Sequence, residues 1–304
     1  MTDVDVLPVR ELRAFDQQPP QMPVGVGKQG KLRLDFERRG DRTSLVRLFR
    51  QAPLLVQQAL YYDDRLPSMP YVSIITISGC VIQGDRYDVR VRVGPDAQAH
   101  VTSQAATKVH EMDANYAAQV QRFVLEPRAY LEVLPRQIIP HRHARFVSTT
   151  TATVHPTATL LYGETLAPGR KHHDDEVFAY DLYAAEVRGD RPDGRRLFTE
   201  RVLVEPHRMA SRVAGVMGPY DAVATVVLMT PAVVADEVAA RAPLGLDVGD
   251  GCAAGTSRLP HDAGLLFKVV GPDVAPVRAV VHRFADVVRE AVCGVPLPEA
   301  EPWR

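Results

Sequence analysis

The sequence predicts a mainly β protein, built as a sandwich, barrel or solenoid, with helices near its C-terminus. Three observations support this fold class. Apolar residues such as Leu32, Leu34 and Phe36 alternate with charged ones, which is the pattern of half-buried strands. Gly-Pro, Gly-Asp and Pro-Asp-Gly turns separate many of the strand-like segments. Near the C-terminus the apolar spacing changes to that of a helix.

The elements follow in order along one predicted domain. Residues 1–28 are rich in Pro, Gln and acidic residues, which predicts a poorly ordered leader. Residues 29–304 form the domain, and its β-body covers about residues 29–230. Strand-like runs lie at residues 31–37, 71–78, 87–93, 97–103, 119–125, 130–134, 145–154, 159–162, 177–187, 196–204, 223–230 and 265–270.

Two helices are expected after the β-body, at residues 231–242 and 276–293. In the second, apolar residues recur at intervals of three and four between Val277 and Val292. Pro276 is placed for a helix start and Gly294 for a helix end. The apolar stripe predicts packing on the β-body, and binding of a partner protein is the alternative.

Charge and cysteine content exclude several classes of protein. The 304 residues hold 36 Lys and Arg against 37 Asp and Glu, so no basic field attracts nucleic acid or an anionic membrane. With 46% hydrophobic residues, the chain is not a disordered one. Three dispersed cysteines predict reduced thiols rather than a disulfide framework. The first residues lack a secretory apolar region, so we expect a cytoplasmic protein.

One glycine-rich motif resembles a nucleotide-binding loop without its context. Residues 25–31 match the spacing of a dinucleotide-binding loop, and Leu32 stands where a phosphate loop needs Ser or Thr. Either loop requires a strand before it and a helix after it, whereas here a Pro-rich leader precedes and a strand follows. We therefore expect no nucleotide site in this chain.

Histidines offer two candidate metal sites. His141 and His143 follow Pro140, and His172 and His173 precede three acidic residues. Imidazole and carboxylate groups suit nickel, zinc or copper. A solvated loop is the favoured explanation of the first pair, and a solvated charge run is that of the second.

Polar residues in two further segments lack an ordinary structural reason. In residues 102–109, small and polar residues including Thr107 end in Lys108, directly after a strand. In residues 162–170, Glu164 ends an apolar strand, and Arg170 follows. Buried groups of this kind must be paired or hydrated, because an unpaired interior charge costs several kcal/mol. The two segments therefore suggest a wet interior.

These segments belong to an ordered set of motifs that resembles the urease accessory protein family UreD, called UreH in some organisms. The resemblance covers about residues 27–215 and, more loosely, the rest. The motifs that carry it are Gly27 to Arg39, Gly79 with Gly84-Asp85, Thr102 to Lys108, Leu131 to Pro135, Ala144-Arg145-Phe146, Leu161 to Glu164 and Leu166 to Arg170. Their common order makes the set specific.

The resemblance implies both a fold and a function. The fold is a two-layer or solenoid-like (β-helix-like) sheet body with helices near the C-terminus. The function is that of a chaperone for urease maturation, not an enzyme, which binds urease apoprotein, a UreF-like protein and, through it, a UreG-like GTPase. Ni²⁺ would pass through its interior in transit, no cofactor would be permanently bound, and GTP would belong to the UreG-like partner.

The chemistry of such a passage selects candidate residues. Oxygen ligands exchange Ni²⁺ more easily than imidazole or thiolate groups do. Asp85, Glu164 and Glu200 follow β-segments at motif positions, and Thr107 supplies a hydroxyl, so these four are the expected transit residues. Lys108, Arg170 and Glu176 are expected to support them through ion pairs, whereas His172 and His173 are candidates either for metal capture or for a change of the surface alone.

Three alternatives to this transit assignment stay open. The carboxylates can be structural, with Glu164 paired to Arg170 or Asp85 to Arg86. The chain can be a metal-dependent enzyme that uses His141 and His143 on a β-scaffold. It can also be a passive assembly scaffold with a sealed interior.

Overall fold

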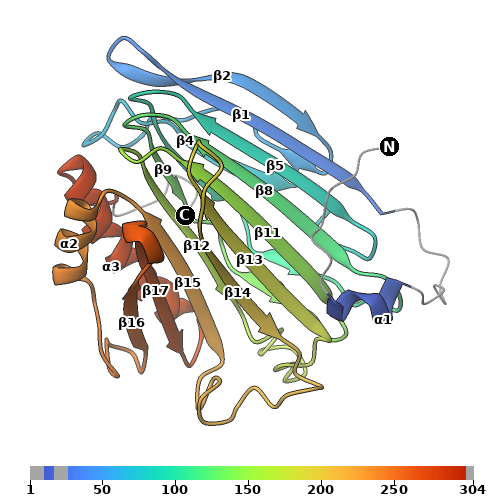
Figure 1. Ribbon diagram of the computed structural model, residues 1–304. Helices are drawn as coiled ribbons and strands as arrows, with labels where there is room; N and C mark the ends of the chain where they lie inside the picture. The colour runs from blue at the N-terminus through green and yellow to red at the C-terminus, as the bar shows by residue number, and fades with distance from the viewer. Residues whose placement is uncertain (1–9, 17–26, 299–304) are drawn as a thin grey trace.

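Two β-sheets face each other and enclose the main hydrophobic core. The computed structural model describes residues 10–16 and 27–298, and all statements about elements refer to these residues. The first sheet has seven strands in the order β14-β13-β11-β8-β5-β1-β2 (Figure 1). The second sheet has the order β16-β17-β15-β12-β9-β6-β4-β3, with the short strands β7 and β10 beside this path.

The first sheet consists of β1 (Gln29–Arg39), β2 (Arg42–Gln51), β5 (Arg86–Val93), β8 (Ala117–Leu125), β11 (Arg145–Val154), β13 (Leu182–Asp190) and β14 (Arg196–Val204). The second consists of β3 (Leu54–Leu55), β4 (Tyr71–Thr76), β6 (Gln98–Ser103), β9 (Tyr130–Val133), β12 (Thr159–Leu166), β15 (Ala222–Met229), β16 (Ala253–Arg258) and β17 (Gly264–Gly271). The strands β7 (Thr107–Val109) and β10 (Ile138–Pro140) pair with each other beside β12, and they lie in the chain segments that lead from the second sheet to the first.

The chain winds between the sheets in the manner of a β-helix. From β5 it passes to β6, back to β8, on to β9, back to β11, and then through β12 to β13. Each return places the new strand parallel to the previous strand of its sheet. Val93 consequently lies beside Leu125, and Leu125 beside Val154. The predicted mainly β, two-layer and solenoid-like body is confirmed.

The alternation of side chains explains why these segments form half-buried strands. Leu32, Leu34 and Phe36 are fully buried in β1, whereas the charged residues between them are partly exposed. In β5, Val89, Val91 and Val93 enter the same core. Because side chains alternate between the faces of a strand, each strand contributes one apolar face to the space between the sheets.

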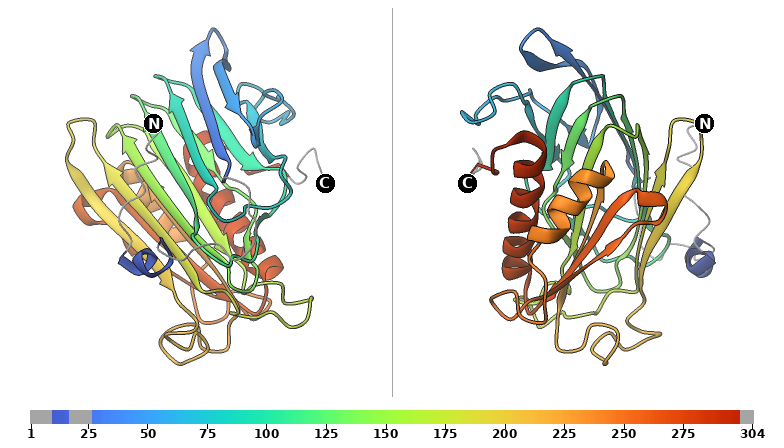
Figure 2. Two further views of the ribbon diagram at one scale, coloured as in Figure 1. Left: turned by 90° about the vertical axis from the view of Figure 1, so that its right-hand side faces the viewer. Right: turned by 60° about the vertical axis from the view of Figure 1, so that its left-hand side comes forward.

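Antiparallel strands and helices complete the fold at its C-terminal side. The strands β15, β17 and β16 extend the second sheet in antiparallel order. The helices α2 (Ala232–Arg241) and α3 (Val274–Cys293) cover the outer face of this sheet (Figure 2). Phe284 of α3 stacks on Phe267 of β17 at 4.2 Å between ring centroids. The apolar stripe of α3 therefore packs on the β-body.

The helix boundaries agree closely with the sequence pattern. The helix α3 begins after Asp273, whose side chain caps Val274 N–H, and ends at Gly294, which has a φ of 74°. A left-handed residue of this kind commonly ends a helix. Among the described residues, neither this helix nor any other combines the length and apolarity needed to cross a membrane.

Some elements differ from the expectation. The strands β2 and β16 were not predicted, because both are edge strands without a regular apolar alternation. The run expected at residues 177–187 becomes a strand only from Leu182. Residues 10–16 of the predicted leader form the 3-10 helix η1 (Arg10–Leu12) and α1 (Arg13–Asp16), and Leu12 is buried in a small cluster on the first sheet. Residues 1–9 and 17–26 of the predicted leader lie outside the described residues.

A buried ion-pair network fixes α3 to the second sheet. Arg289 donates two hydrogen bonds to Glu132 of β9, at 2.8 and 2.7 Å, and one to Asp63 at 2.9 Å. It also donates to the hydroxyl of Tyr71 in β4. Glu132 accepts a further contact from His100 at 2.6 Å. The side chains of Arg289 and Glu132 are both fully buried.

Burial alone would raise the pKa of Glu132, but Arg289 and His100 outweigh it and hold that pKa well below its ordinary value. The carboxylate is therefore ionised in the fold. Its charge depends on the guanidinium of a helix that is distant in sequence.

Replacing Arg289 with Met should destabilise the protein by about 3–5 kcal/mol, because Glu132 and Asp63 would remain as buried charges without their cation. Urea denaturation followed by circular dichroism measures the loss. Arg241→Ala is the matched control, since Arg241 pairs with Glu290 at the surface and is 41% exposed; it should cost at most about 1 kcal/mol. Equal losses in the two variants would contradict the role given to the buried network.

Candidate functional site

A polar cavity lies between the two sheets, beside the short strands β7 and β10. It contains about 690 Å³ of space outside protein atoms, including its open mouth. Its polar lining includes Thr107, Gln119, Gln121 and Glu164. These residues come from β7, β8 and β12, so the winding of the chain brings them together. We call this space the first cavity.

Glu164 is the acidic group of the first cavity. It is 9% exposed. Its carboxylate accepts hydrogen bonds from Ser148 at 2.8 Å and from Tyr183 at 3.4 Å. Burial raises the pKa of Glu164, and the hydroxyl groups offset part of that increase. Nearby positive charge would lower that pKa and stabilise the carboxylate.

A hydrogen-bonded cluster of polar side chains lies beside Glu164 in the same interior. Gln121 donates to Thr150 at 3.1 Å and to the hydroxyl of Tyr162 at 2.9 Å. Thr150 also donates to Tyr162, at 3.0 Å. These side chains come from three different strands, β8, β11 and β12. The wet interior suggested by the sequence thus has polar groups on both sheets.

Glu164 also lines a second cavity, on the side of β13 and β14. Glu200, Tyr183 and Thr225 are among the other lining residues. Glu200 pairs with Lys268 at 2.6 Å, and its side chain is 20% exposed. Three of the four expected transit residues, Thr107, Glu164 and Glu200, therefore lie on two cavities that share Glu164.

Asp85, the fourth expected transit residue, lies elsewhere. It lines neither cavity and is fully buried in the turn before β5. Its carboxylate accepts hydrogen bonds from the backbone of Lys28 at 2.7 Å and Ile82 at 3.1 Å, and from Tyr87 at 2.9 Å. Arg86 contacts only its backbone carbonyl. Asp85 holds the turn against the start of β1.

The glycine motifs near Asp85 serve the same junction. A Cβ at Gly27 would lie 2.0 Å from the backbone of Gly84, and Gly84 has a φ of 79°. Only glycine permits both the close approach and the left-handed conformation without strain. Residues 29 and 30 of the glycine-rich segment begin β1, and residues 25 and 26 lie outside the described residues.

The supporting residues are arranged differently from the expectation. Arg170 pairs with Glu176, at 2.7 Å between Nε and Oε2, so the alternative in which Arg170 pairs with Glu164 does not occur. This pairing holds the pKa of Glu176 below its usual value. Lys108 is exposed, because Thr107 and Lys108 point to opposite sides of β7. Neither cation approaches the carboxylate of Glu164.

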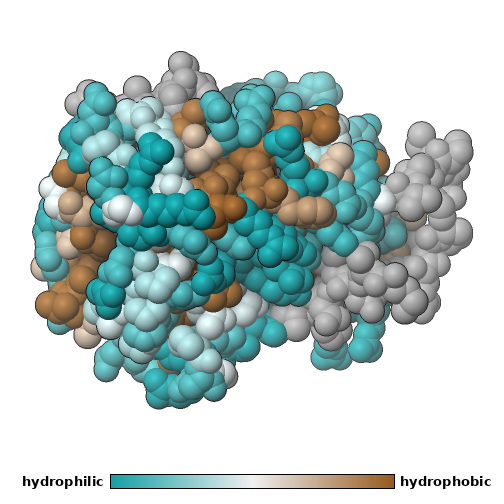
Figure 3. All heavy atoms as spheres, turned by 90° about the horizontal axis from the view of Figure 1, so that it is seen from above, coloured by the Kyte–Doolittle hydropathy of each residue, from teal (hydrophilic) through white to brown (hydrophobic). Residues whose placement is uncertain are grey.

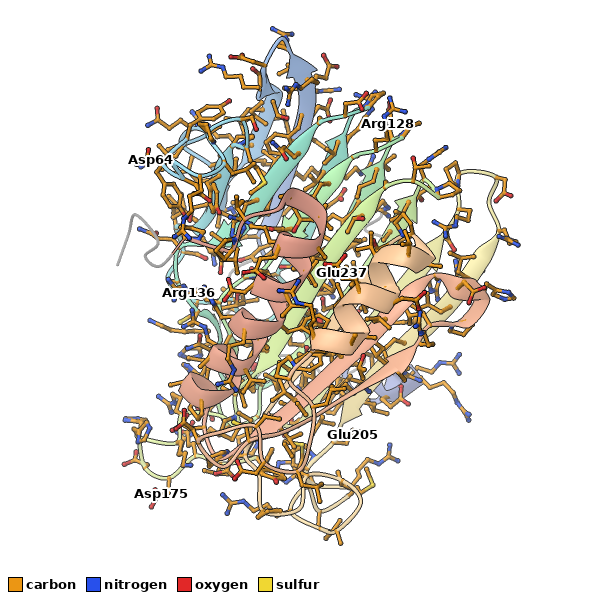
Figure 4. The ribbon with its side chains drawn as sticks, turned by 90° about the vertical axis from the view of Figure 1, so that its left-hand side faces the viewer. Asp64, Arg128, Arg136, Asp175, Glu205 and Glu237 are labelled. Carbon is orange, nitrogen blue, oxygen red and sulfur yellow. The ribbon has the colours of Figure 1, made fainter. Side chains whose placement is uncertain are left out.

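The histidine candidates occupy separate places. His172 and His173 have side chains that are 84% and 59% exposed, each 3.5 Å from a carboxylate. They lie in the loop marked by Asp175 in Figure 4, at the lower end of the molecule. His141 faces His110, with 5.4 Å between ring centroids, whereas His143 contacts Asp181 at 3.2 Å. The structure does not bring His141 and His143 into one metal site.

Several site residues carried no signal in the sequence. Ser148 and Tyr183 contact Glu164, but Ser148 is one of several hydroxyl residues in β11 and Tyr183 lies in the apolar run that begins β13, so neither is conspicuous in the sequence. Asp181 and His207 lie beside His143 although they are far from it in sequence. Only the pairing of β11, β13 and β14 brings these groups together.

Burial and the neighbouring Arg170 lower the pKa of His141 to about 4. The unfolded chain protonates this imidazole near its ordinary pKa of about 6.5, so stability should fall as the pH drops from there toward 4. His141→Gln should remove this part of the acid sensitivity. Urea denaturation near neutral pH and near pH 5 measures it, and an identical loss in both proteins would contradict the assignment.

Comparison with known proteins identifies the family. A family model described as UreD urease accessory protein matches residues 28–304. The urease accessory protein UreD of Photorhabdus laumondii subsp. laumondii is 47% identical over 296 residues, which cover 97% of this chain and 92% of that protein. UreD 2 of Brucella ovis is 47% identical over 296 residues, covering 97% and 98%. UreD of Yersinia pseudotuberculosis is 46% identical, covering 97% and 92%. The chain belongs to the UreD family of urease accessory proteins.

Proposed function

We propose that this protein is a chaperone of urease maturation that passes Ni²⁺ through the space between its two sheets. One observation carries the proposal: Glu164 lies on both interior cavities, with Thr107 on one of them and Glu200 on the other. A hydrated path through these cavities would offer an ion successive oxygen ligands.

The lining chemistry supports transit rather than storage. Besides apolar side chains, the residues around the two cavities contribute hydroxyl, amide and carboxylate groups and the guanidinium of Arg136, and none of them is Cys or His. Imidazole and thiolate groups bind nickel tightly, so a path that used them would retain the ion. Hydroxyl and carboxylate oxygens hold it weakly enough to release it.

The electrostatics of Glu164 support the same function. Its hydrogen-bonding partners are the hydroxyl groups of Ser148 and Tyr183, and Arg170 is paired with Glu176 instead. A divalent cation beside Glu164 would supply positive charge and stabilise the ionised carboxylate.

Family membership suggests the partners. We infer that the chain binds urease apoprotein and a UreF-like accessory protein, and through it a UreG-like GTPase that holds the GTP. Apolar side chains gather in the middle of the face seen from above, with polar side chains around them (Figure 3). Such a surface is typical of protein-binding sites. In this proposal the chain acts in the cytoplasm, without a permanent cofactor and without catalysing a reaction.

Glu164→Gln should lower the nickel content and activity of urease several-fold while the accessory complex still forms. The amide preserves the size of the side chain but removes its charge. Folding should tolerate the change, because burial raises the pKa of Glu164 and the neutral amide removes the charge that burial penalises. The variant is coexpressed with urease and the other accessory proteins, and the complex is isolated for nickel analysis.

Glu186→Gln is the matched control for this experiment. Glu186 lies in β13 like Tyr183, but it pairs with Arg188 and does not line either cavity. It should leave nickel loading unchanged. Normal loading in a Glu164→Gln, Glu200→Gln double variant would reject the conduit and favour a passive scaffold. Loss of the complex itself would identify Glu164 as a structural residue.

A further inference from the structure

We propose that His143, Asp181 and His207 bind a divalent cation of the nickel, copper and zinc class at the surface. Their ligand atoms all lie within 4.8 Å of one another. Imidazole and carboxylate groups together are the donors that these late first-row metals prefer. This group is separate from the two interior cavities, and none of its members lines them.

The measured separations suit one ion. His143 Nδ1 lies 3.2 Å from Asp181 Oδ1, and His207 Nε2 lies 3.5 Å from the same oxygen. Ligands held about 2.1 Å from a tetrahedral ion lie about 3.4 Å from one another. The three atoms therefore need only small side-chain adjustments to surround a cation, and water would complete the coordination.

Arg145 positions the carboxylate of this group. Its Nε donates to Asp181 Oδ2 at 2.8 Å, which leaves Oδ1 facing both imidazoles. The Arg145 side chain is 7% exposed, donates to the carbonyl of Asn115 at 3.3 Å and lies over the ring of Phe15 at 4.2 Å. Ligating carboxylates in metal sites are commonly oriented by such an outer hydrogen bond.

The fold converges on this group from three neighbouring strands. His143 precedes β11, Asp181 precedes β13 and His207 follows β14, and these strands are adjacent in the first sheet. Figure 4 marks Glu205, two residues before His207, near the lower end of the molecule. The side chains of His143 and His207 are 53% and 55% exposed, and that of Asp181 is 14% exposed. An ion can therefore reach the group from solvent.

The other histidines lack this arrangement. Within residues 10–16 and 27–298, His143, Asp181 and His207 are the one set of three His, Cys, Asp or Glu side chains arranged to share an ion. The exposed pair His172 and His173, a candidate for metal capture, lacks a third ligand in this range. Metal binding at the surface group does not depend on the conduit. Within the class of nickel, copper and zinc, only the identification of nickel as the natural ion rests on the proposed function.

The test measures metal binding by the full-length protein, which is purified with an affinity tag that contains no histidine. Ni²⁺ and, separately, Zn²⁺ are titrated calorimetrically into the wild type, a His143→Ala, His207→Ala double variant, and Asp181→Asn. We expect the double variant to lose one equivalent of bound metal, and Asp181→Asn to bind that equivalent at least about tenfold more weakly. Unchanged stoichiometry and affinity in the double variant would overturn the proposal.

His155→Ala is the matched control, because it also removes one imidazole from a turn of the first sheet. Its turn adjoins Arg128, whose N–H donates to Thr157 at 3.0 Å, at the opposite end of the molecule (Figure 4). Metal binding should be retained. The proposal would be rejected if a His172→Ala, His173→Ala variant lost one equivalent of bound metal while the His143→Ala, His207→Ala variant kept it. The metal site would then lie at His172 and His173.

Two readouts separate this inference from the proposed function. Circular dichroism should show the same fold and melting temperature for the double variant and the wild type in metal-free buffer, since both imidazoles are largely solvated. Metal titration needs no urease, whereas the Glu164→Gln experiment measures nickel in urease. If the wild type binds metal at this group and the Glu164→Gln variant still delivers nickel to urease normally, the surface site is supported and the conduit is rejected.

Discussion

The buried pair of Arg289 and Glu132 is the interaction on which the arrangement of the molecule depends. It joins the last helix to the middle of the second sheet, and Asp63 and Tyr71 extend it toward the edge of that sheet. A buried charge of this kind is tolerated only with its partner in place. The C-terminal helix is therefore part of the same cooperative unit as strands formed from the first half of the chain.

The two faces of the second sheet differ in how their buried charges are paired. On the outer face, α2 and α3 complete an apolar core, and every charge near Glu132 is paired. On the inner face, Glu164 is buried with hydroxyl groups alone as its hydrogen-bonding partners. A charge-poor environment around an acid is costly for folding, and such costs commonly mark functional sites.

The winding of the chain determines which polar groups meet in the interior. Successive passes place β8, β11 and β13 side by side in one sheet, opposite β12 in the other. Gln121, Thr150 and Tyr162 thereby form one hydrogen-bonded group, although they come from three different strands. The same strand order gathers His143, Asp181 and His207 at one end of the first sheet.

The sequence by itself determined the class of fold, most strand positions, the two C-terminal helices and the family. These depend on local patterns, such as the alternation around Leu34 and the helical spacing up to Gly294, which can be seen along the chain without knowledge of its tertiary contacts. It also indicated that Thr107, Glu164 and Glu200 are unusual, because polar groups next to buried strands require a reason. Tertiary structure decided their partners: Glu164 faces Ser148 rather than Arg170, and Asp85 anchors a turn. Such contacts depend on which strands pair and in which register, and single-chain periodicity does not encode that order.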